Sequence, residues 1–317
     1  MTAPRYASID VGSNTVRLLI VERNQEGGLR DLRRERRITR LGGNFSREGK
    51  LDESAMLRTL AALQSFADLL AQEKVEAVFA VATGVVREAG NGREWIAEVL
   101  KKTGIPLRRI SGEEEGRLML RGVRGALREE VLSGIFADIG GWSTEILWVE
   151  GDRPRKTRSL ELGVVALCER FLQSDPPGIE ELKAMENHAQ GVLKRSREWF
   201  TREGLEWSKL ASRFVGTAGT MTTLAAIDQR LSIYDPQRIS GHRISRSALR
   251  EIYWHLRSLP MRERREIPGL EEGREDLIVA GAGVALSILS VFEGKEWVVI
   301  DSGLLEGALL EGISRLS

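Results

Sequence analysis

Two segments of the chain place an aspartate two residues before a glycine, at the end of an apolar run. These pairs are Asp10 with Gly12 and Asp138 with Gly140. A glycine at a turn lets the backbone approach an anion without a Cβ clash, and successive N–H groups in such a turn form an anion-binding nest. The aspartates would repel a phosphate unless a hard cation lay between them. We therefore expect Mg²⁺, with Mn²⁺ as a substitute, held through the two carboxylates.

The elements that position these residues are two similar hairpins. Residues 6–21 align with residues 134–149 without a gap, and each segment is predicted as an apolar strand, a small polar turn and a second β-rich strand. A single glycine-tipped hairpin is more often only a turn. Two copies in register instead favour two domains of the same topology.

A third glycine-rich loop follows the short apolar run at 214–215 and precedes a helix predicted over Met221 to Leu231. A strand that is followed by a glycine loop and a helix N-terminus directs backbone N–H groups at an anion. Such loops also serve as plain connections. Together with the hairpins this loop gives a predicted phosphate-binding set, which comprises Asp10, Gly12, Ser13, Asn14, Gly140, Gly141, Ser143, Gly216, Thr217 and Gly219.

The catalytic candidate is an acidic residue at a predicted helix start, after a strand predicted over 105–110. Ser111 with Glu114 has the spacing of a capping box, and acids in a first turn complement the helix dipole. That structural role accounts for any one acid of this turn. Glu115, however, precedes the connection into the second hairpin, where a cleft between two like domains would lie. A carboxylate there could take a proton from a water aimed at a phosphorus atom.

Length and composition limit the classes of protein. A chain of 317 residues predicts two domains, at 1–124 and 125–301, with 302–317 packing back on the first. The net charge of +1 argues against a nucleic-acid binder. No apolar run reaches the roughly 18–20 residues of a membrane span. The single cysteine, Cys168, excludes an internal disulfide, fits a reducing cytoplasm and is expected to be a small core residue.

Other chemistries lack their residue patterns. The sequence has no phosphate-binding P-loop pattern and no nucleophile-elbow pattern around a serine. Its three histidines have no metal-ligand spacing. Gly281 and Gly283 lie within an apolar helical run, 277–288, and predict close helix packing. Six arginines between residues 30 and 40 are either the solvated face of an exposed strand or a guide for a long polyanion, and both interpretations stay open.

Seven motifs together resemble the exopolyphosphatase / guanosine pentaphosphate phosphohydrolase (Ppx/GppA) family. They are residues 10–18, 82–91, 111–118, 138–145, 159–163, 216–220 and 273–276. The resemblance covers residues 6 to 312. It implies an α/β fold of two ribonuclease-H-like domains, of the actin / sugar kinase / heat-shock ATPase superfamily, with a cleft between them. It also implies the short two-domain form and Mg²⁺-dependent release of a terminal phosphate.

The resemblance assigns roles to individual residues. Glu115 matches the glutamate that activates water, and Arg17 and Arg87 match arginines that hold phosphates. Arg274 is a candidate for a guanosine-phosphate contact. The metal ligands that it implies are Asp138 and Glu145, together with Asp10.

The implied substrates are inorganic polyphosphate and guanosine pentaphosphate of the stringent response. Both present the same terminal group, so the sequence does not choose between them. We expect a cytoplasmic homodimer with no nucleic-acid or membrane partner. A non-hydrolytic guanosine tetra- or pentaphosphate sensor and an ATP-dependent kinase of the same superfamily are the alternatives. Three residues depart from the family pattern, namely Trp142 for a glycine, Gly116 for an alanine and Leu305 for an arginine.

Overall fold

The computed structural model describes residues 3–45, 49–127, 132–151, 153–207 and 213–316. The chain divides into two compact units. Unit 1 comprises Met1–Gly125 with Leu304–Ser317, and unit 2 comprises Ala126–Gly303. Among the described residues, no helix combines the length and the apolarity that crossing a bilayer requires.

Unit 1 is built on a five-stranded sheet with the order β3-β2-β1-β4-β5. Its strands are β1 (Arg5–Val11), β2 (Thr15–Arg23), β3 (Leu29–Ile38), β4 (Ala77–Ala82) and β5 (Leu107–Arg109). Its helices are α2 (Glu53–Gln72), α3 (Gly84–Glu88), α4 (Gly92–Thr103), α5 (Gly112–Ala126) and α13 (Leu304–Leu316).

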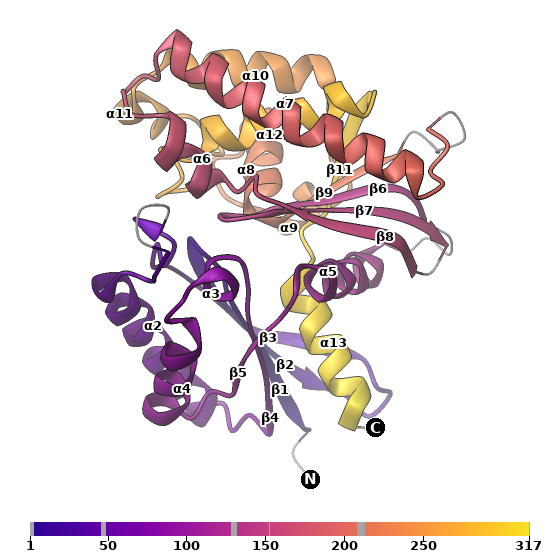
Figure 1. Ribbon diagram of the computed structural model, residues 1–317. Helices are drawn as coiled ribbons and strands as arrows, with labels where there is room; N and C mark the ends of the chain where they lie inside the picture. The colour runs from indigo at the N-terminus through magenta and orange to yellow at the C-terminus, as the bar shows by residue number, and fades with distance from the viewer. Residues whose placement is uncertain (1–2, 46–48, 128–131, 152, 208–212, 317) are drawn as a thin grey trace. The chain divides into compact units, whose positions relative to one another are not determined.

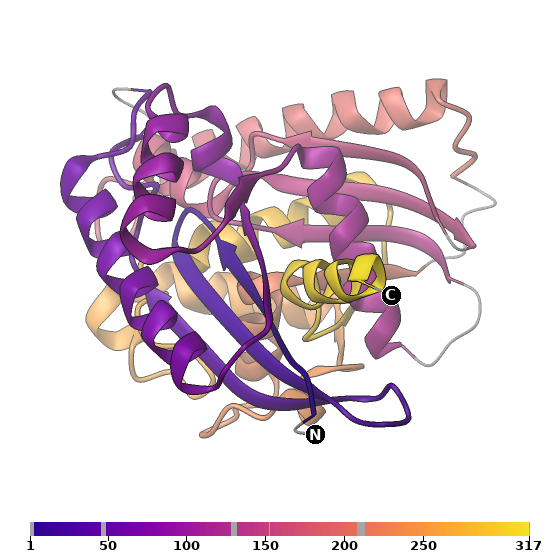
Figure 2. The same ribbon diagram turned by 90° about the horizontal axis from the view of Figure 1, so that it is seen from below.

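Helices cover both faces of this sheet (Figure 2). The alternation of side chains along β1 and β2 sends Tyr6 and Leu19 toward α13, where they pack with Leu309 and Ile313. The opposite face carries α2 and α4. Helix α2 starts where the side chain of Asp52 accepts a hydrogen bond from the backbone N–H of residue 55. The last helix of the chain is therefore part of the core of unit 1.

Unit 2 contains a six-stranded sheet with the order β10-β11-β9-β6-β7-β8. Its strands are β6 (Leu132–Ile139), β7 (Thr144–Gly151), β8 (Arg153–Leu160), β9 (Phe214–Thr217), β10 (Arg243–Ser245) and β11 (Glu296–Val299). Its helices are α6 (Val164–Phe171), α7 (Ile179–Arg202), α8 (Ala218–Asp228), α9 (Pro236–Ile239), α10 (Arg246–Ser258), α11 (Met261–Arg264) and α12 (Ile278–Val291).

The core of unit 2 is centred on α12, which is apolar on nearly every side and lies beside α7 and α10 (Figure 1). A Cβ added to Gly281 would lie 2.5 Å from Cγ2 of Thr220, and one on Gly283 would lie 3.0 Å from Cε of Met185. The predicted close helix packing at these glycines is confirmed. Their small size lets neighbouring elements approach the α12 backbone directly.

The two sheets share one topology, which confirms the predicted α/β fold class. In unit 1, β1, β2 and β3 form antiparallel pairs, and β4 and β5 continue the sheet in parallel beyond β1. In unit 2, β6, β7 and β8 repeat the antiparallel meander, and β9 and β11 continue in parallel beyond β6. This is a ribonuclease-H-like arrangement in each unit, and the antiparallel strand β10 extends the second sheet.

Several sequence predictions need correction. The strand predicted over 105–110 is confined to β5, and the helix predicted from Met221 begins earlier, at Ala218. Residues 261–275 are exposed or half-buried apart from Glu275 and Arg264, and Arg264, which is only 2% exposed, pairs with Asp175. Cys168 was expected in the core but is half-buried, with its Sγ donating to the carbonyl of Asp276 at 3.3 Å.

Candidate functional site

The first hairpin joins Asp10 at the end of β1 to Arg17 on β2. The two residues are cross-strand neighbours, and Nη2 of Arg17 donates to Oδ2 of Asp10 at 2.6 Å. Asp10 is 4% exposed, and its other oxygen, Oδ1, is buried with no hydrogen-bond partner among the described residues. A buried carboxylate oxygen without a partner is costly unless a cation or donor reaches it. Asp10 therefore has the free acceptor that a bound cation requires.

Backbone hydrogen bonds hold the turn of this hairpin. The N–H of Gly12 donates to the carbonyl of Thr15 at 3.0 Å, and the N–H of Gly42 donates to the carbonyl of Ser13 at 2.7 Å. Both side-chain polar atoms of Asn14 are buried and lack a hydrogen-bond partner within the described part of the chain. The predicted phosphate-binding residues of unit 1 thus lie in one turn, in which the buried amide of Asn14 has no hydrogen-bond partner among the described residues.

Glu115 lies in the first turn of α5 and pairs with Arg87 of α3. Nη1 of Arg87 donates to Oε2 of Glu115 at 2.7 Å, and Glu115 is 6% exposed. Helix α3 also contacts the first hairpin, because the N–H of Val85 donates to Oγ of Ser13 at 3.2 Å. Hydrogen bonds thus connect Glu115 to α3 and α3 to the turn that is predicted to bind phosphate.

The neighbouring acid has a different role. Oγ of Ser111 accepts from the N–H of Glu114 at 3.1 Å, which is the helix cap predicted from the sequence. The carboxylate of Glu114 pairs with Arg108 at 2.8 Å instead of returning to the cap residue. Glu114 therefore takes the structural role in this acidic turn, whereas Glu115 pairs with Arg87.

In unit 2, Asp138 and Glu145 lie directly opposite each other on β6 and β7. Both are buried, with exposed fractions of 6% and 1%. Oγ of Ser159, which is opposite Glu145 on β8, donates to Oε1 of Glu145 at 2.6 Å. Ser159 belongs to a recognised motif but was not predicted as a site residue. Ser159 lies opposite Glu145 because β7 pairs with β8, and this pairing could not be read from the sequence.

The second hairpin turn is fixed by the start of α6. The N–H groups of Val164 and Val165 donate to the carbonyls of Gly140 and Gly141 at 3.0 and 2.8 Å. A Cβ on Gly163 would lie 2.0 Å from the carbonyl carbon of Trp142, so only glycine fits. The backbone of Trp142, one of the three departures from the family pattern, therefore packs directly against Gly163, whose N–H donates to the Trp142 carbonyl at 3.0 Å.

The third loop joins the same end of the sheet. Thr217 is the parallel neighbour of Asp138, and Thr220 donates from Oγ1 to the carbonyl of Ile139 at 2.9 Å. A Cβ on Gly219 would lie 1.9 Å from Nη2 of Arg274, so the guanidinium lies directly against this glycine. The predicted residues of unit 2 thus gather at the ends of β6 and β9.

The predicted residues form two groups, one in each unit. No cluster of three or more potential metal-binding side chains occurs among the residues that the structure describes. Mg²⁺ does not need such a cage, since it is commonly bound through one or two carboxylates together with substrate phosphates and water.

The arginine-rich segment coincides with β3, and several of its side chains pair with carboxylates of unit 1. Arg30 contacts Glu22 at 2.8 Å, and Arg34 contacts Glu306 at 2.6 Å. Arg37 contacts Glu35 at 2.9 Å. Much of the positive charge is therefore compensated locally, which favours a solvated strand face over a guide for a polyanion.

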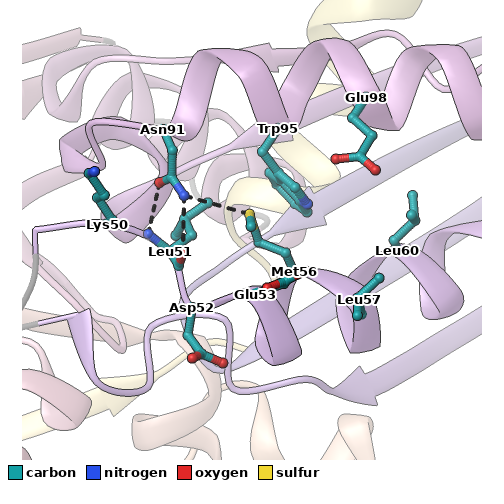
Figure 3. Close-up of a pocket in the computed structure, with 10 residues that line it drawn as sticks. All are labelled: Lys50, Leu51, Asp52, Glu53, Met56, Leu57, Leu60, Asn91, Trp95 and Glu98. Atoms are coloured by element: carbon teal, nitrogen blue, oxygen red, sulfur yellow. Dashed lines mark hydrogen bonds between the residues drawn. The ribbon is translucent and has the colours of Figure 1, made fainter.

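A cavity of about 440 Å³ opens in unit 1 between the start of α2 and helix α4 (Figure 3). Its lining includes three carboxylates, from Asp52, Glu53 and Glu98, and one lysine, Lys50. None of the lining residues belongs to the predicted phosphate-binding set. The acidic balance disfavours a phosphate ligand, so the cavity is separate from the candidate site.

A family model described as the Ppx/GppA phosphatase family matches residues 20–316. The chain belongs to this family. A Ppx/GppA relative from Mycobacterium tuberculosis, named exopolyphosphatase 2, is 33% identical over 323 residues, which cover 99% of this chain and 98% of that protein.

Solved structures of Ppx/GppA proteins have the same fold. The crystal structure of the Aquifex aeolicus family member is 32% identical, with a TM-score of 0.81 and coverage of 99% of both chains. The crystal structure of an exopolyphosphatase from Cytophaga hutchinsonii is 27% identical, with a TM-score of 0.88 and coverage of 98% of both chains. Both comparisons extend over nearly the whole chain, so the family assignment applies to both units.

Proposed function

We propose that this protein releases the terminal phosphate of inorganic polyphosphate, of guanosine pentaphosphate, or of both, with Glu115 activating the attacking water. The observation that carries the proposal is the chain of contacts from Glu115 through Arg87 and α3 to Ser13 of the first hairpin. Phosphoryl transfer requires mainly positioning and charge stabilisation. A carboxylate fixed by an arginine beside a phosphate-binding turn provides both.

Carboxylates in each unit suit a divalent cation. Oδ1 of Asp10 is buried without a hydrogen-bond partner among the described residues, and the carboxylates of Asp138 and Glu145 form a buried cross-strand pair. Oxygen ligands of this kind suit Mg²⁺ or Mn²⁺. When bound, the ion would neutralise charge on the terminal phosphate. Asn14 and the hairpin N–H groups would orient that phosphate, and Arg17 would counter its charge.

Each of the predicted domains, 1–124 with 302–317 and 125–301, would supply one phosphate-binding hairpin. Polyphosphate is supported by the relative named exopolyphosphatase 2. Guanosine pentaphosphate is supported by Arg274, which lies against the loop at Gly219. The cytoplasmic homodimer without nucleic-acid or membrane partners stays a prediction.

A side-by-side assay tests the proposal. Phosphate release is measured from polyphosphate and from guanosine pentaphosphate, each with Mg²⁺, with Mn²⁺ and with a chelator. We expect metal-dependent release from at least one substrate. Tight binding of guanosine pentaphosphate without release would instead indicate a sensor. In a parallel incubation with ATP, ADP formation that depends on an acceptor would indicate a kinase.

A further inference from the structure

Helix α5, which carries Glu115, packs along its side against α13. Helices α5 and α13 both belong to unit 1. A Cβ on Gly307 of α13 would lie 1.8 Å from the carbonyl oxygen of Leu118 and 3.2 Å from the backbone nitrogen of Gly122. The two backbones are therefore in direct contact, one turn beyond Glu115.

Apolar packing reinforces this crossing. Leu118 of α5 is buried with Leu304 and Ala308 of α13 and with Val81 and Ile110 of the sheet region. These contacts fix the distance between the helices. Apolar contacts are not directional, however, and they do not by themselves determine how α5 is rotated about its axis.

A buried carboxylate supplies the directional contact. Glu311 of α13 is 6% exposed, and both of its oxygens accept from Arg117 of α5, with 2.8 Å between Oε1 and Nη2. Arg121, one turn further along α5, donates from Nη2 to the carbonyl of Leu310 at 3.1 Å and to Oγ of Ser314 at 3.0 Å. Arg315 also donates to Glu311. The planar fork of an arginine on a carboxylate holds two atoms at once and so fixes orientation.

We infer that Glu311 is a positioning residue for the reaction, which sets the rotation of α5 and thereby the direction of the Glu115 carboxylate. The inference rests on the proposed function. The Arg117 side chain is 44% exposed, so solvent screening limits what the ion pair adds to stability, and conformational specificity is the role that its geometry favours. Arg117 is two residues from Glu115 on the same helix, so a rotation that relaxes Arg117 also moves Glu115.

The test is Glu311→Gln, which keeps the side-chain shape and removes the charge. A misplacement of about 1 Å can cost about 10²-fold in rate, so we expect kcat for phosphate release to fall roughly 10- to 100-fold while KM changes less than about twofold. Glu306→Gln is the matched control. Glu306 is on the same helix but pairs with Arg34 of β3, so its loss should leave kcat within about twofold of the wild type.

Three results would overturn the inference: a kcat for Glu311→Gln within about twofold of the wild type, a KM that rises as much as kcat falls, or an equal loss in Glu306→Gln. If Glu311→Gln does not fold, Arg117→Gln removes the same contact from the α5 side and must show the same kcat loss. Glu115→Gln is measured in parallel. If it stays active, the proposed role of Glu115 fails; if it is inactive while both contact variants are active, only the positioning role fails.

Discussion

Arg87 and Glu115 are 28 residues apart in the sequence and joined by a hydrogen bond of 2.7 Å between Nη1 and Oε2. The pair links the short helix α3 to the first turn of α5. Because α3 also donates from its backbone to Ser13, the acid is fixed relative to the hairpin that is proposed to bind phosphate. The orientation of a catalytic carboxylate is part of what makes it effective.

Replacing Glu115 with glutamine should lower phosphate release by about 10²–10⁴-fold, the usual contribution of a general base. The amide keeps the size of the side chain but cannot accept the proton. Glu114→Gln is the adjacent control, because Glu114 pairs with Arg108 and should stay within about threefold of the wild type. A loss of less than about tenfold in Glu115→Gln would be too small for a general base.

Much of the fold could be predicted from the sequence, because the duplicated hairpins carry a strong local signal. Apolar runs and the paired Asp-x-Gly turns define β1–β2 and β6–β7 without any tertiary information. The partners of the site residues were less accessible. Ser159 contacts Glu145 only because β8 pairs with β7, and Glu311 contacts Arg117 across almost two hundred positions. Such contacts depend on tertiary packing, which leaves no periodic pattern in the sequence.

The burial of a single charged side chain is equally hard to predict. The stretch from Met261 to Glu275 is rich in charge, which is typical of an exposed loop. Arg264 is nevertheless buried, because its guanidinium reaches the carboxylate of Asp175 and the backbone carbonyls of Leu259 and Glu275. Composition indicates how many charges a segment carries, but it does not show whether buried carboxylates or carbonyls pair with them.

Asp10→Asn should raise the Mg²⁺ concentration needed for half-maximal activity by on the order of 10–100-fold, because the charged oxygen proposed for the cation is lost. An amide oxygen can still accept from Arg17, so the hairpin should keep its fold. Asp31→Asn is the control, since Asp31 is half-exposed and pairs with Arg34 on β3. An unchanged Mg²⁺ titration in Asp10→Asn would exclude Asp10 as a metal ligand.

Gly219→Ala should displace the guanidinium of Arg274, because the new Cβ would lie 1.9 Å from Nη2. The obstacle is the end of a flexible side chain, so the unit should still fold. If Arg274 contacts the guanosine part, KM for guanosine pentaphosphate should rise about tenfold, which corresponds to about 1.4 kcal/mol. KM for polyphosphate should stay within about twofold, because alanine keeps the backbone N–H that is proposed to bind phosphate. Arg274→Ala should reproduce this selectivity. An equal rise for both substrates would show that Arg274 contacts a phosphate that they share.

The stability of the protein should depend on Glu311 in a defined pH range. Its hydrogen bond from Arg117 holds the pKa of the Glu311 carboxyl below the ordinary value of 4.5, against the opposing effect of burial. A carboxyl whose pKa is lower in the folded than in the unfolded state contributes stability above the unfolded value and loses it as pH falls through the folded value. The free-energy difference between wild type and Glu311→Gln, measured by urea unfolding, should therefore be constant from pH 7 to 5 and shrink below about 4.5. Glu180→Gln, at a surface position with an 81% exposed side chain, should show little difference from wild type at any of these pH values. A difference for Glu311→Gln that stays constant down to pH 3 would show that the ion pair does not depress this carboxyl.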